Sequence, residues 1–449
     1  MKKFTLREIA AACGGQYFGD EALKDTAVTS VERDSREIKE GSLFLAIKGG
    51  RVDGHDFIEK CYDSGAVCAI CETAPENAKK PYILVPSTLE AVKKIGRAYR
   101  EKFDIPVVGV SGSVGKTSTK EMLYAVLSQK FKTHKTQGNL NNELGVPLTL
   151  LSMPEDAQAA VIEMGISGFG EMTRLAEMAQ PTVCVLTVIG CCHLENLGDR
   201  DGVLKAKTEM FAHAREGAAF ILNGDDDKLS TVTEVNGQKP IFFGLDKSNR
   251  YYAENIENNG EGGVSCTLCF DGKRLDVTIP AIGSYMVSNA LAAVATGDLL
   301  GLSDEQLKNG VEAYKTVGSR ANVINTGRFR IIDDCYNANP TSVKASLDTL
   351  MNFPGRRVAV LGDMKELGQN ELSLHFDTGA YAKELGVDLV LAVGPLAKEL
   401  AKGAGGEWFA SIDALTPMLP ALINDGDTVL VKASHSMQFE KITEFLKTL

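Results

Sequence analysis

Long apolar runs and an excess of positive charge are both missing from this chain of 449 residues. No stretch of about 18 apolar residues, the length that spans a bilayer, occurs in it. The N-terminal Met-Lys-Lys-Phe-Thr-Leu resembles the start of a signal peptide, but Arg7 and Glu8 interrupt the apolar segment that would follow. A net charge of −11 argues against a nucleic-acid surface. We therefore expect a cytoplasmic protein without a transmembrane segment and without a nucleic-acid partner.

Two nucleotide-binding fingerprints are absent as well. No Gly-x-Gly-x-x-Gly run marks a dinucleotide site, and Gly362-Asp-Met does not make one. No Asn-Lys-x-Asp motif is present, which disfavours a GTP-dependent switch protein that regulates a partner. The usual phosphate-loop pattern, G-x-x-x-x-G-K-[ST], also lacks its first glycine, because Val110 stands in that place. Any phosphate loop in this chain is therefore a variant.

Cysteine is present but scattered, with ten residues in mostly apolar contexts. Two pairs, Cys68/Cys71 and Cys266/Cys269, have Cys-x-x-Cys spacing in segments that we predict to be strands. Residues three apart in a strand point to opposite faces, so neither pair readily binds one ion. Buried reduced thiols are favoured, and a zinc site is the alternative.

Residues 106–120, Pro-Val-Val-Gly-Val-Ser-Gly-Ser-Val-Gly-Lys-Thr-Ser-Thr-Lys, predict a buried strand, a glycine turn and a helix start. Gly112 and Gly115 let backbone N–H groups approach phosphate oxygens, and the positive end of the following helix points at them. Lys116 adds a full charge, and Thr117 adds a hydroxyl for Mg²⁺. The segment predicts a site for a nucleotide polyphosphate. An ordinary strand-to-helix turn rich in small residues is the alternative.

The chain is too long for one hydrophobic core, and its pattern predicts three α/β domains. Residues 1–86 form a small α/β unit, and residues 87–317 alternate strands and helices, which is typical of a mostly parallel sheet covered on both faces. An antiparallel ribbon is expected at 251–279. Residues 318–449 predict a second doubly wound, Rossmann-like sheet. The predicted strands are 28–31, 43–47, 66–70, 83–85, 107–110, 159–163, 183–188, 218–222, 329–332, 357–361, 389–393 and 428–431, and the predicted helices are 57–64, 89–103, 286–300, 342–351 and 371–385.

Candidate metal ligands follow predicted strands of the central domain, where an active site is expected. Glu163 ends Ala-Ala-Val-Ile-Glu, and a carboxylate beside a triphosphate suits Mg²⁺. His193 follows Val-Leu-Thr-Val-Ile-Gly-Cys-Cys, although a lone histidine is more often structural. Lys207 is by default a solvated helix lysine. The residue pattern alone leaves the roles of His193 and Lys207 open.

Two runs concentrate amide side chains. Gly138-Asn-Leu-Asn-Asn-Glu-Leu-Gly-Val-Pro147 suits a sugar or peptide ligand, although it is also compatible with a turn and a helix cap. Asp333-Asp-Cys-Tyr-Asn-Ala-Asn-Pro-Thr-Ser342 suits a ribose, a base or a substrate backbone, with Asn337 and Asn339 as candidate contacts. The alternative for this second run is an Asn-Pro turn that opens the next helix.

Five motifs in order resemble the Mur ligases of bacterial cell-wall synthesis over almost the whole chain. They are Asp34-Ser-Arg-Glu-Ile-Lys-Glu-Gly-Ser-Leu-Phe-Leu-Ala-Ile-Lys-Gly49 with Asp53-Gly-His-Asp-Phe, Gly112-Ser-Val-Gly-Lys-Thr-Ser-Thr-Lys-Glu121, Gly138 to Thr149, Asp333 to Pro340, and Leu361-Gly-Asp-Met-Lys-Glu-Leu-Gly368. The asparagine cluster and the Tyr-Asn-Ala-Asn-Pro block favour the branch that adds a dipeptide. A tripeptide-forming Mur ligase and a folylpolyglutamate synthetase are the nearest alternatives.

The resemblance implies a reaction and its participants. An ATP-dependent ligase would join D-alanyl-D-alanine to a UDP-N-acetylmuramoyl-tripeptide through an acyl phosphate, in peptidoglycan precursor synthesis. ATP and Mg²⁺ would be required, the substrates would be small molecules, and we expect a monomer. Closure of the third domain about residues 316–320 would exclude water from the acyl phosphate.

The resemblance also implies roles for individual residues. The UDP end would contact Ser35, Arg36 and Asp53, and substrate in the central cleft would contact Asn139, Asn141 and Asn142. One Mg²⁺ would be held by Thr117 and Glu163, and a second by His193 and by Lys207 as a carbamate. The expected catalytic residues are Lys116, Glu163, His193, Lys207 and Arg320, and the expected ATP contacts are Gly112, Ser113, Gly115, Lys116, Thr117, Ser118, Asn289, Arg320 and Asp334.

The sequence departs from the family pattern in three places. Tyr285 stands where the family usually has a histidine, and His435 stands where an arginine is common. The segment Glu163 to Met172 lacks the His/Arg-Pro that often precedes its Gly-Glu. These differences concern details of substrate contact and leave the expected reaction class unchanged.

Overall fold

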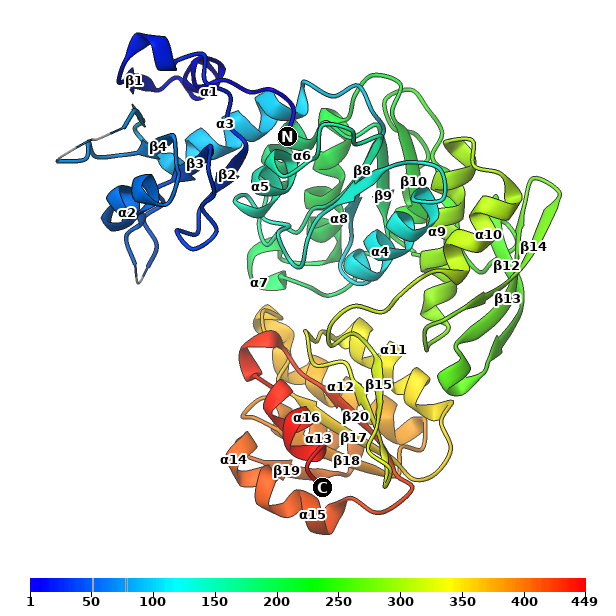
Figure 1. Cartoon of the computed structure of the whole chain (residues 1–449). Coiled ribbons are helices and arrows are strands. Elements are labelled where there is room, and N and C mark those ends of the chain that lie inside the picture. The colour runs from blue at the N-terminus through cyan, green and yellow to red at the C-terminus, as the bar shows by residue number, and fades with distance from the viewer. Residues whose placement is uncertain (51, 77, 79) are drawn as a thin grey trace.

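The computed structural model describes residues 1–50, 52–76, 78 and 80–449, and it contains three β-sheets in succession along the chain (Figure 1). The predicted α/β class with a mostly parallel central sheet is confirmed. The predicted domain boundaries, 86/87 and 317/318, fall between the last strand of one sheet and the first strand of the next, and they remain predictions. None of the helices in the described ranges is both long and apolar enough to span a bilayer.

The N-terminal sheet has five short strands in the order β1-β5-β4-β3-β2, of which only β1 is antiparallel to its neighbour. In β4, Cys68 packs in one apolar cluster and Cys71 in another, as the alternation of side chains along a strand requires. Helix α1 was not predicted, although Thr5 and Glu8 form a capping box at its start. The bounds are β1 (Gln16–Phe18), β2 (Ser30–Glu32), β3 (Ser42–Leu45), β4 (Cys68–Cys71), β5 (Tyr82–Leu84), α1 (Leu6–Cys13) and α2 (Ile58–Asp63).

Helix α3 (Thr88–Arg100) joins the first sheet to the second. It packs against α1 on one side and against α5 (Gly145–Leu151) and α6 (Glu171–Ala179) on the other. Its Gly96 lies so close to Pro147 of α5 that an added Cβ would meet the Pro147 side chain at 2.6 Å. One apolar cluster therefore runs from the N-terminal sheet through α3 into the central sheet.

The central sheet has nine strands in the order β14-β13-β12-β11-β10-β9-β6-β8-β7, with β6 in the middle of the parallel part. Helices α4, α9 and α10 share one apolar cluster with this sheet, and α5, α6 and α8 share another. The predicted antiparallel ribbon corresponds to β12, β13 and β14. The bounds are β6 (Val107–Ser111), β7 (Thr133–Lys135), β8 (Ala159–Glu163), β9 (Val183–Leu186), β10 (Ala219–Asn223), β11 (Ile241–Phe243), β12 (Tyr251–Asn258), β13 (Val264–Phe270), β14 (Lys273–Ile279), α4 (Lys116–Leu127), α7 (Leu194–Leu197), α8 (Arg200–Thr208), α9 (Tyr285–Leu299) and α10 (Asp304–Glu312).

The C-terminal sheet has six strands in the order β15-β16-β20-β17-β18-β19, parallel except for β15. Apolar clusters cover both of its faces, which fits the predicted doubly wound arrangement. It lies beside the central sheet, with α11 facing the junction (Figure 1). The bounds are β15 (Asn322–Asn325), β16 (Arg330–Asp333), β17 (Arg357–Gly362), β18 (Leu389–Val393), β19 (Glu407–Phe409), β20 (Thr428–Lys432), α11 (Pro340–Met351), α12 (Glu371–Glu384), α13 (Ala397–Ala404), α14 (Ile412–Leu415), α15 (Leu419–Leu422) and α16 (Glu440–Leu446).

Candidate active site

A cavity of about 510 Å³ lies between the central sheet and the C-terminal sheet. Most of the residues predicted from the sequence to contact ATP, metal or the central part of the substrate line it together. They are Ser113, Gly115, Lys116, Thr117, Ser118, Asn141, Asn142, Glu163, His193, Asn289, Arg320, Asp334, Asn337 and Asn339. The cavity is large enough for a nucleotide-sized ligand.

The glycine turn after β6 forms one wall of this cavity. Gly112 has φ +148°, and a Cβ at this position would lie 1.9 Å from Thr187 Oγ1, so only glycine fits there. Gly115 has φ +83° and precedes α4, whose first three residues line the cavity. The first backbone N–H groups of a helix have no partner within the helix. Lys116 donates from Nζ to the carbonyl oxygen of Gly112 at 2.8 Å, and burial lowers its pKa. This is the geometry of an anion site at a helix N-terminus.

Glu163 ends β8 directly beside Thr117. The Thr117 hydroxyl lies 2.9 and 3.1 Å from the two carboxylate oxygens, and Asn141 donates from Nδ2 to Oε1 at 2.8 Å. The Nζ of Lys120, which is buried, is 3.6 Å from Oε2. A hydroxyl and a carboxylate side by side are oxygen ligands of the kind that Mg²⁺ takes.

His193 immediately precedes α7 and lines the cavity. His193 Nδ1 is 2.5 Å from Glu366 Oε2 of the C-terminal unit, and apart from this contact it has no hydrogen-bond partner among the described residues. Burial lowers the pKa of His193, and the nearby Lys116 and Lys207 ammonium groups lower it further, against the effect of Glu366. An unprotonated imidazole nitrogen in this place is a possible metal ligand.

Lys207 is a buried residue of α8, which contradicts the default expectation of a solvated helix lysine. Burial lowers its pKa to about 8, with a further lowering from Lys116 and an opposing effect of Cys192. Carbon dioxide reacts only with an uncharged amine, so this lowered pKa favours the carbamate that the family resemblance implies. Lys207 is not among the residues that line the cavity.

The C-terminal side of the cavity is built around Asp334. Its carboxylate accepts from Ser346 Oγ at 2.6 Å, from Lys432 Nζ at 2.6 Å and from the Ala321 N–H at 3.1 Å. Arg320 lies over the ring of Tyr336, with 4.0 Å between its guanidinium carbon and the ring centroid. These contacts fix both residues at the cavity wall.

Several cavity residues were missed by the sequence analysis. Lys432 ends β20, which pairs with β16 just before Asp334, so the rule that parallel strands end at one edge was enough to find it. Tyr285 was noted as a departure from the family but not placed at the site. The lining residues that were not named as site candidates include Ser167, Glu171, Thr187, Asn223, Phe243, Tyr285, Ser288, Tyr336, Thr341, Ser342, Ser346 and Lys432.

The structural alternatives for the two amide-rich runs are also present. Asn142 accepts from the Gly145 N–H at 2.8 Å at the start of α5, and Asn339 accepts from the Ser342 N–H at 2.8 Å as the cap of α11. Both residues line the cavity as well. Asn139, by contrast, is exposed on the preceding turn and outside the cavity.

The predicted UDP contacts lie in the N-terminal unit, away from this cavity. Arg36 is exposed and pairs with Asp34 at 2.5 Å, and Ser35 stands between them in a turn. Asp53 accepts from the His55 N–H at 3.0 Å. None of the three residues lines the cavity that contains the phosphate loop, and their contact with UDP remains a prediction.

The ligand groups at the cavity suit Mg²⁺, which takes part of its ligands from substrate and water, better than a metal ion bound by protein side chains alone. No group of three or more His, Cys, Asp or Glu side chains with metal-site geometry occurs within the ranges that the structure describes. Mg²⁺ is typically bound by one or two carboxylates together with substrate phosphates and water. Thr117 with Glu163, and the imidazole of His193, supply such partial ligand sets next to the phosphate loop.

Comparisons with known proteins cover the chain from end to end. Three family models match it: "Mur ligase family, catalytic domain" at residues 27–100, "Mur ligase middle domain" at 110–297 and "Mur ligase, glutamate ligase domain" at 319–435. The UDP-N-acetylmuramoyl-tripeptide--D-alanyl-D-alanine ligase of Bacillus subtilis is 34% identical and covers 99% of both chains.

Solved structures agree with this relationship. A crystal structure of MurF from Acinetobacter baumannii is 32% identical, covers 100% of both chains and has a TM-score of 0.91. The MurF ligase of Thermotoga maritima in complex with ADP is 31% identical over 93% of this chain and 97% of its own, with a TM-score of 0.82. On these matches and on the geometry of the cavity, the chain belongs to the Mur ligase family.

Proposed function

We propose that this protein uses ATP to join D-alanyl-D-alanine to a UDP-N-acetylmuramoyl-tripeptide in peptidoglycan precursor synthesis. The observation that carries the proposal is the cavity itself, in which the phosphate loop with Lys116 faces Arg320 and Asp334 of the C-terminal unit. Relatives with this named activity match nearly the whole chain. The ADP complex of the similar Thermotoga maritima protein supports a nucleotide as the ligand.

The chemistry follows from the poor reactivity of a carboxylate toward amines. Transfer of the ATP γ-phosphoryl group to the carboxylate of the tripeptide gives an acyl phosphate and ADP. The amine of D-alanyl-D-alanine then loses a proton and attacks the acyl carbon, and phosphate leaves. Such a reaction needs positioning and charge stabilisation and no protein nucleophile.

The side chains of the cavity supply that stabilisation. Lys116 at the glycine turn and Arg320 above Tyr336 place two cations beside a site that must hold two anions together. Two Mg²⁺ ions would offset charge on the phosphate oxygens. Thr117 and Glu163 would hold one ion, and His193 and carbamylated Lys207 would hold the other. The remaining ATP contacts in the proposal are Gly112, Ser113, Gly115, Ser118, Asn289 and Asp334.

The remaining parts of the proposal concern the UDP and peptide contacts, the oligomeric state and the cellular location of the protein. Ser35, Arg36 and Asp53 would bind the UDP end, while the central and C-terminal asparagines would bind the peptide part. We propose a monomer, because one chain brings the phosphate loop, Glu163 and Arg320 together in one cavity. We place the reaction in the cytoplasm, which supplies ATP and nucleotide-linked precursors.

A ligation assay tests this function. Purified protein is incubated with ATP, Mg²⁺, D-alanyl-D-alanine and each of two UDP-N-acetylmuramoyl-tripeptides, which end in lysine or diaminopimelate, and the products are identified by mass spectrometry. We expect a pentapeptide product and one phosphate released per bond, with both the UDP-linked tripeptide and D-alanyl-D-alanine required. Hydrolysis of GTP alone, or of ATP without product, would contradict the proposal.

A further inference from the structure

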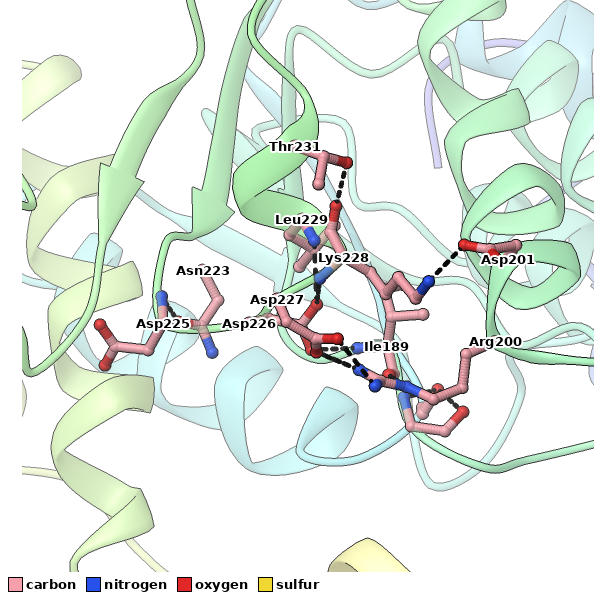
Figure 2. A network of polar contacts seen from close by, with 12 residues as sticks. Ile189, Arg200, Asp201, Asn223, Asp225, Asp226, Asp227, Lys228, Leu229 and Thr231 are labelled. Atoms are coloured by element: carbon pink, nitrogen blue, oxygen red, sulfur yellow. Dashed lines mark hydrogen bonds and ion pairs between the residues drawn. The ribbon is translucent and has the colours of Figure 1, made fainter.

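Asp226 and Arg200 hold the backbone of Ile189 at its N–H and at its carbonyl oxygen (Figure 2). Neither residue lines the cavity. The Ile189 N–H donates to Asp226 Oδ2 at 2.8 Å, and the Ile189 carbonyl oxygen accepts from Arg200 Nε at 2.8 Å. The Ile189 side chain is fully buried. We refer to Asp226, Arg200 and the Ile189 peptide between them as the Ile189 clamp.

Asp226 does more than cap its own turn after β10. Its Oδ1 accepts from the backbone N–H groups of Lys228 and Leu229 at 3.0 and 2.9 Å, while its Oδ2 reaches Ile189 on a different loop (Figure 2). The carboxylate is buried, and a carboxylate is the one side chain of this size that only accepts, at both oxygens. A turn cap alone requires one oxygen, so the second oxygen serves the neighbouring loop.

Arg200 approaches the same peptide from the first turn of α8. Its terminal nitrogens bind the exposed carboxylate of Asp227, including a 2.9 Å bond from Nη1 to Oδ2, while its Nε is the atom that donates to Ile189 (Figure 2). Lys228 pairs with Asp201 of the same helix at 2.6 Å. Lys207 is seven residues further along α8, so the clamp also fixes the helix that carries it.

The residues on either side of Ile189 are bound to the phosphate loop. The carbonyl oxygen of Val188 accepts from the Ser113 N–H at 2.7 Å, and the Gly190 N–H donates to Ser113 Oγ at 2.9 Å. His193 follows three residues after Gly190. A shift of the Ile189 peptide would therefore displace the phosphate loop and His193 together.

We propose that Asp226 and Arg200 are positioning residues for ATP and its metal in this protein. They hold the segment 188–193 in register with the phosphate loop, and they tie α8 to the same point, so that Ser113, His193 and Lys207 keep their relative places. Support of ligands by hydrogen-bonded neighbours commonly matters nearly as much as the ligands themselves. The inference rests on the proposed function for the identity of the ligand.

Three single substitutions separate positioning from general stability. Asp226→Asn keeps one oxygen for Lys228 and Leu229 but turns an NH₂ group toward the Ile189 N–H. Arg200→Lys keeps a positive charge near Asp227 and loses the Nε donor. Asp227→Asn is the matched control, because it weakens only an exposed ion pair and leaves both bonds to Ile189.

The measurement is calorimetric binding of a non-hydrolysable ATP analogue over a series of Mg²⁺ concentrations, beside kcat and KM of ligation and the unfolding temperature. We expect Asp226→Asn and Arg200→Lys to raise the half-saturating Mg²⁺ concentration about 10-fold or more. Binding of the UDP-tripeptide should not change. The double variant should lose less than the product of the two single effects, because both act on one peptide.

The inference is wrong if either clamp variant, folded as judged by its unfolding temperature, keeps the Mg²⁺ dependence and turnover of Asp227→Asn. If Asp226→Asn does not fold, Arg200→Lys alone decides, since that side chain is partly exposed. If the unmodified protein forms no ligation product, the proposed function fails, and the analogue titration still tests the clamp.

Discussion

The hydroxyl of Thr117 lies 2.9 Å from one carboxylate oxygen of Glu163 and 3.1 Å from the other. The two residues come from different elements, the first turn of α4 and the last position of β8, which are neighbours because β6 and β8 pair in parallel. This contact joins the phosphate loop to the acidic strand end. Its chemistry predicts how the protein depends on magnesium.

Glu163→Gln should weaken binding of magnesium with nucleotide while preserving the shape of the site. The amide keeps one acceptor for Thr117 but removes the negative charge that attracts Mg²⁺. We expect the half-saturating Mg²⁺ concentration for ATP turnover to rise about 10-fold or more. Glu121→Gln is the control, because Glu121 is buried in the same charge network and pairs with Lys120 and Lys135 without contacting Thr117. Equal Mg²⁺ dependence in the two variants would contradict this assignment.

Arg320→Ala should separate catalysis from substrate binding. Arg320 lies over Tyr336 at the edge of the cavity, far along the chain from the proposed UDP contacts. We expect turnover to fall on the order of 100-fold, because a cation aimed at the transferred phosphoryl group is lost. Calorimetric binding of the UDP-tripeptide should remain close to that of the unmodified protein. Arg320→Lys, which keeps the charge but not the planar contact with Tyr336, should be intermediate.

A parallel loss of UDP-tripeptide affinity in Arg320→Ala would argue against this division of labour. Arg328→Lys serves as the control, because Arg328 is an exposed residue of the same C-terminal unit that pairs with Asp425. It should change neither quantity.

Lys207 should be carbamylated, and the modification should increase with pH. Burial lowers the pKa of Lys207 to about 8. At pH 7 about a tenth of such amines are uncharged, compared with about three in ten thousand at the ordinary lysine value of 10.5. Because CO₂ adds to the uncharged form, carbamate and the activity that depends on it should rise as the pH increases from 7 to 8.

The measurement is carbon-13 NMR of protein kept in labelled bicarbonate. One carbamate signal should appear and should be lost in Lys207→Met, while Lys205→Met, an exposed position of the same helix, should retain it. A signal that survives in Lys207→Met would place the modification elsewhere. Ligation activity of the Lys207→Met variant should be insensitive to bicarbonate.

The sequence was sufficient to predict the strands whose pattern depends on burial alone. The predicted strands at 159–163 and 389–393 match β8 and β18 residue for residue, because both are short apolar runs inside parallel sheets. Short edge strands such as β7 and β19 were missed, since three partly exposed residues give no periodic signal. Helix α1 was missed although its capping box is visible in the sequence.

The residues of the candidate site also fall into those that the sequence predicted and those that it did not. Lys116, Thr117 and Glu163 were predictable from local pattern, because the chemistry of a phosphate loop is written in consecutive residues. Lys432 was harder to predict, because the rule that parallel strands end at one edge locates it only once β20 is known to pair with β16. The burial of Lys207 also depends on tertiary packing, and a solvated and a buried helix lysine look alike in sequence.

Arg100 should contribute strongly to stability without taking part in the reaction. It is fully buried at the end of α3 and donates to three backbone carbonyl oxygens, those of Ala179, Phe103 and Gln180, at 2.9, 2.7 and 3.2 Å. Burial lowers its pKa to about 10, so it stays charged at neutral pH. Arg100→Met leaves these carbonyl groups without their donor in a buried place. We expect a loss of at least about 2 kcal/mol in the free energy of unfolding.

Urea denaturation of Arg100→Met and Arg97→Met measures this effect at matched positions of one helix. Arg97 is 52% exposed and pairs with the neighbouring Glu101, so its replacement should cost less than about 0.5 kcal/mol. Because α3 joins the N-terminal and central sheets through one apolar cluster, the Arg100 variant should still unfold in a single transition at lower urea concentration. An early separate transition of the N-terminal unit would instead show that Arg100 couples the two sheets more than it stabilises either.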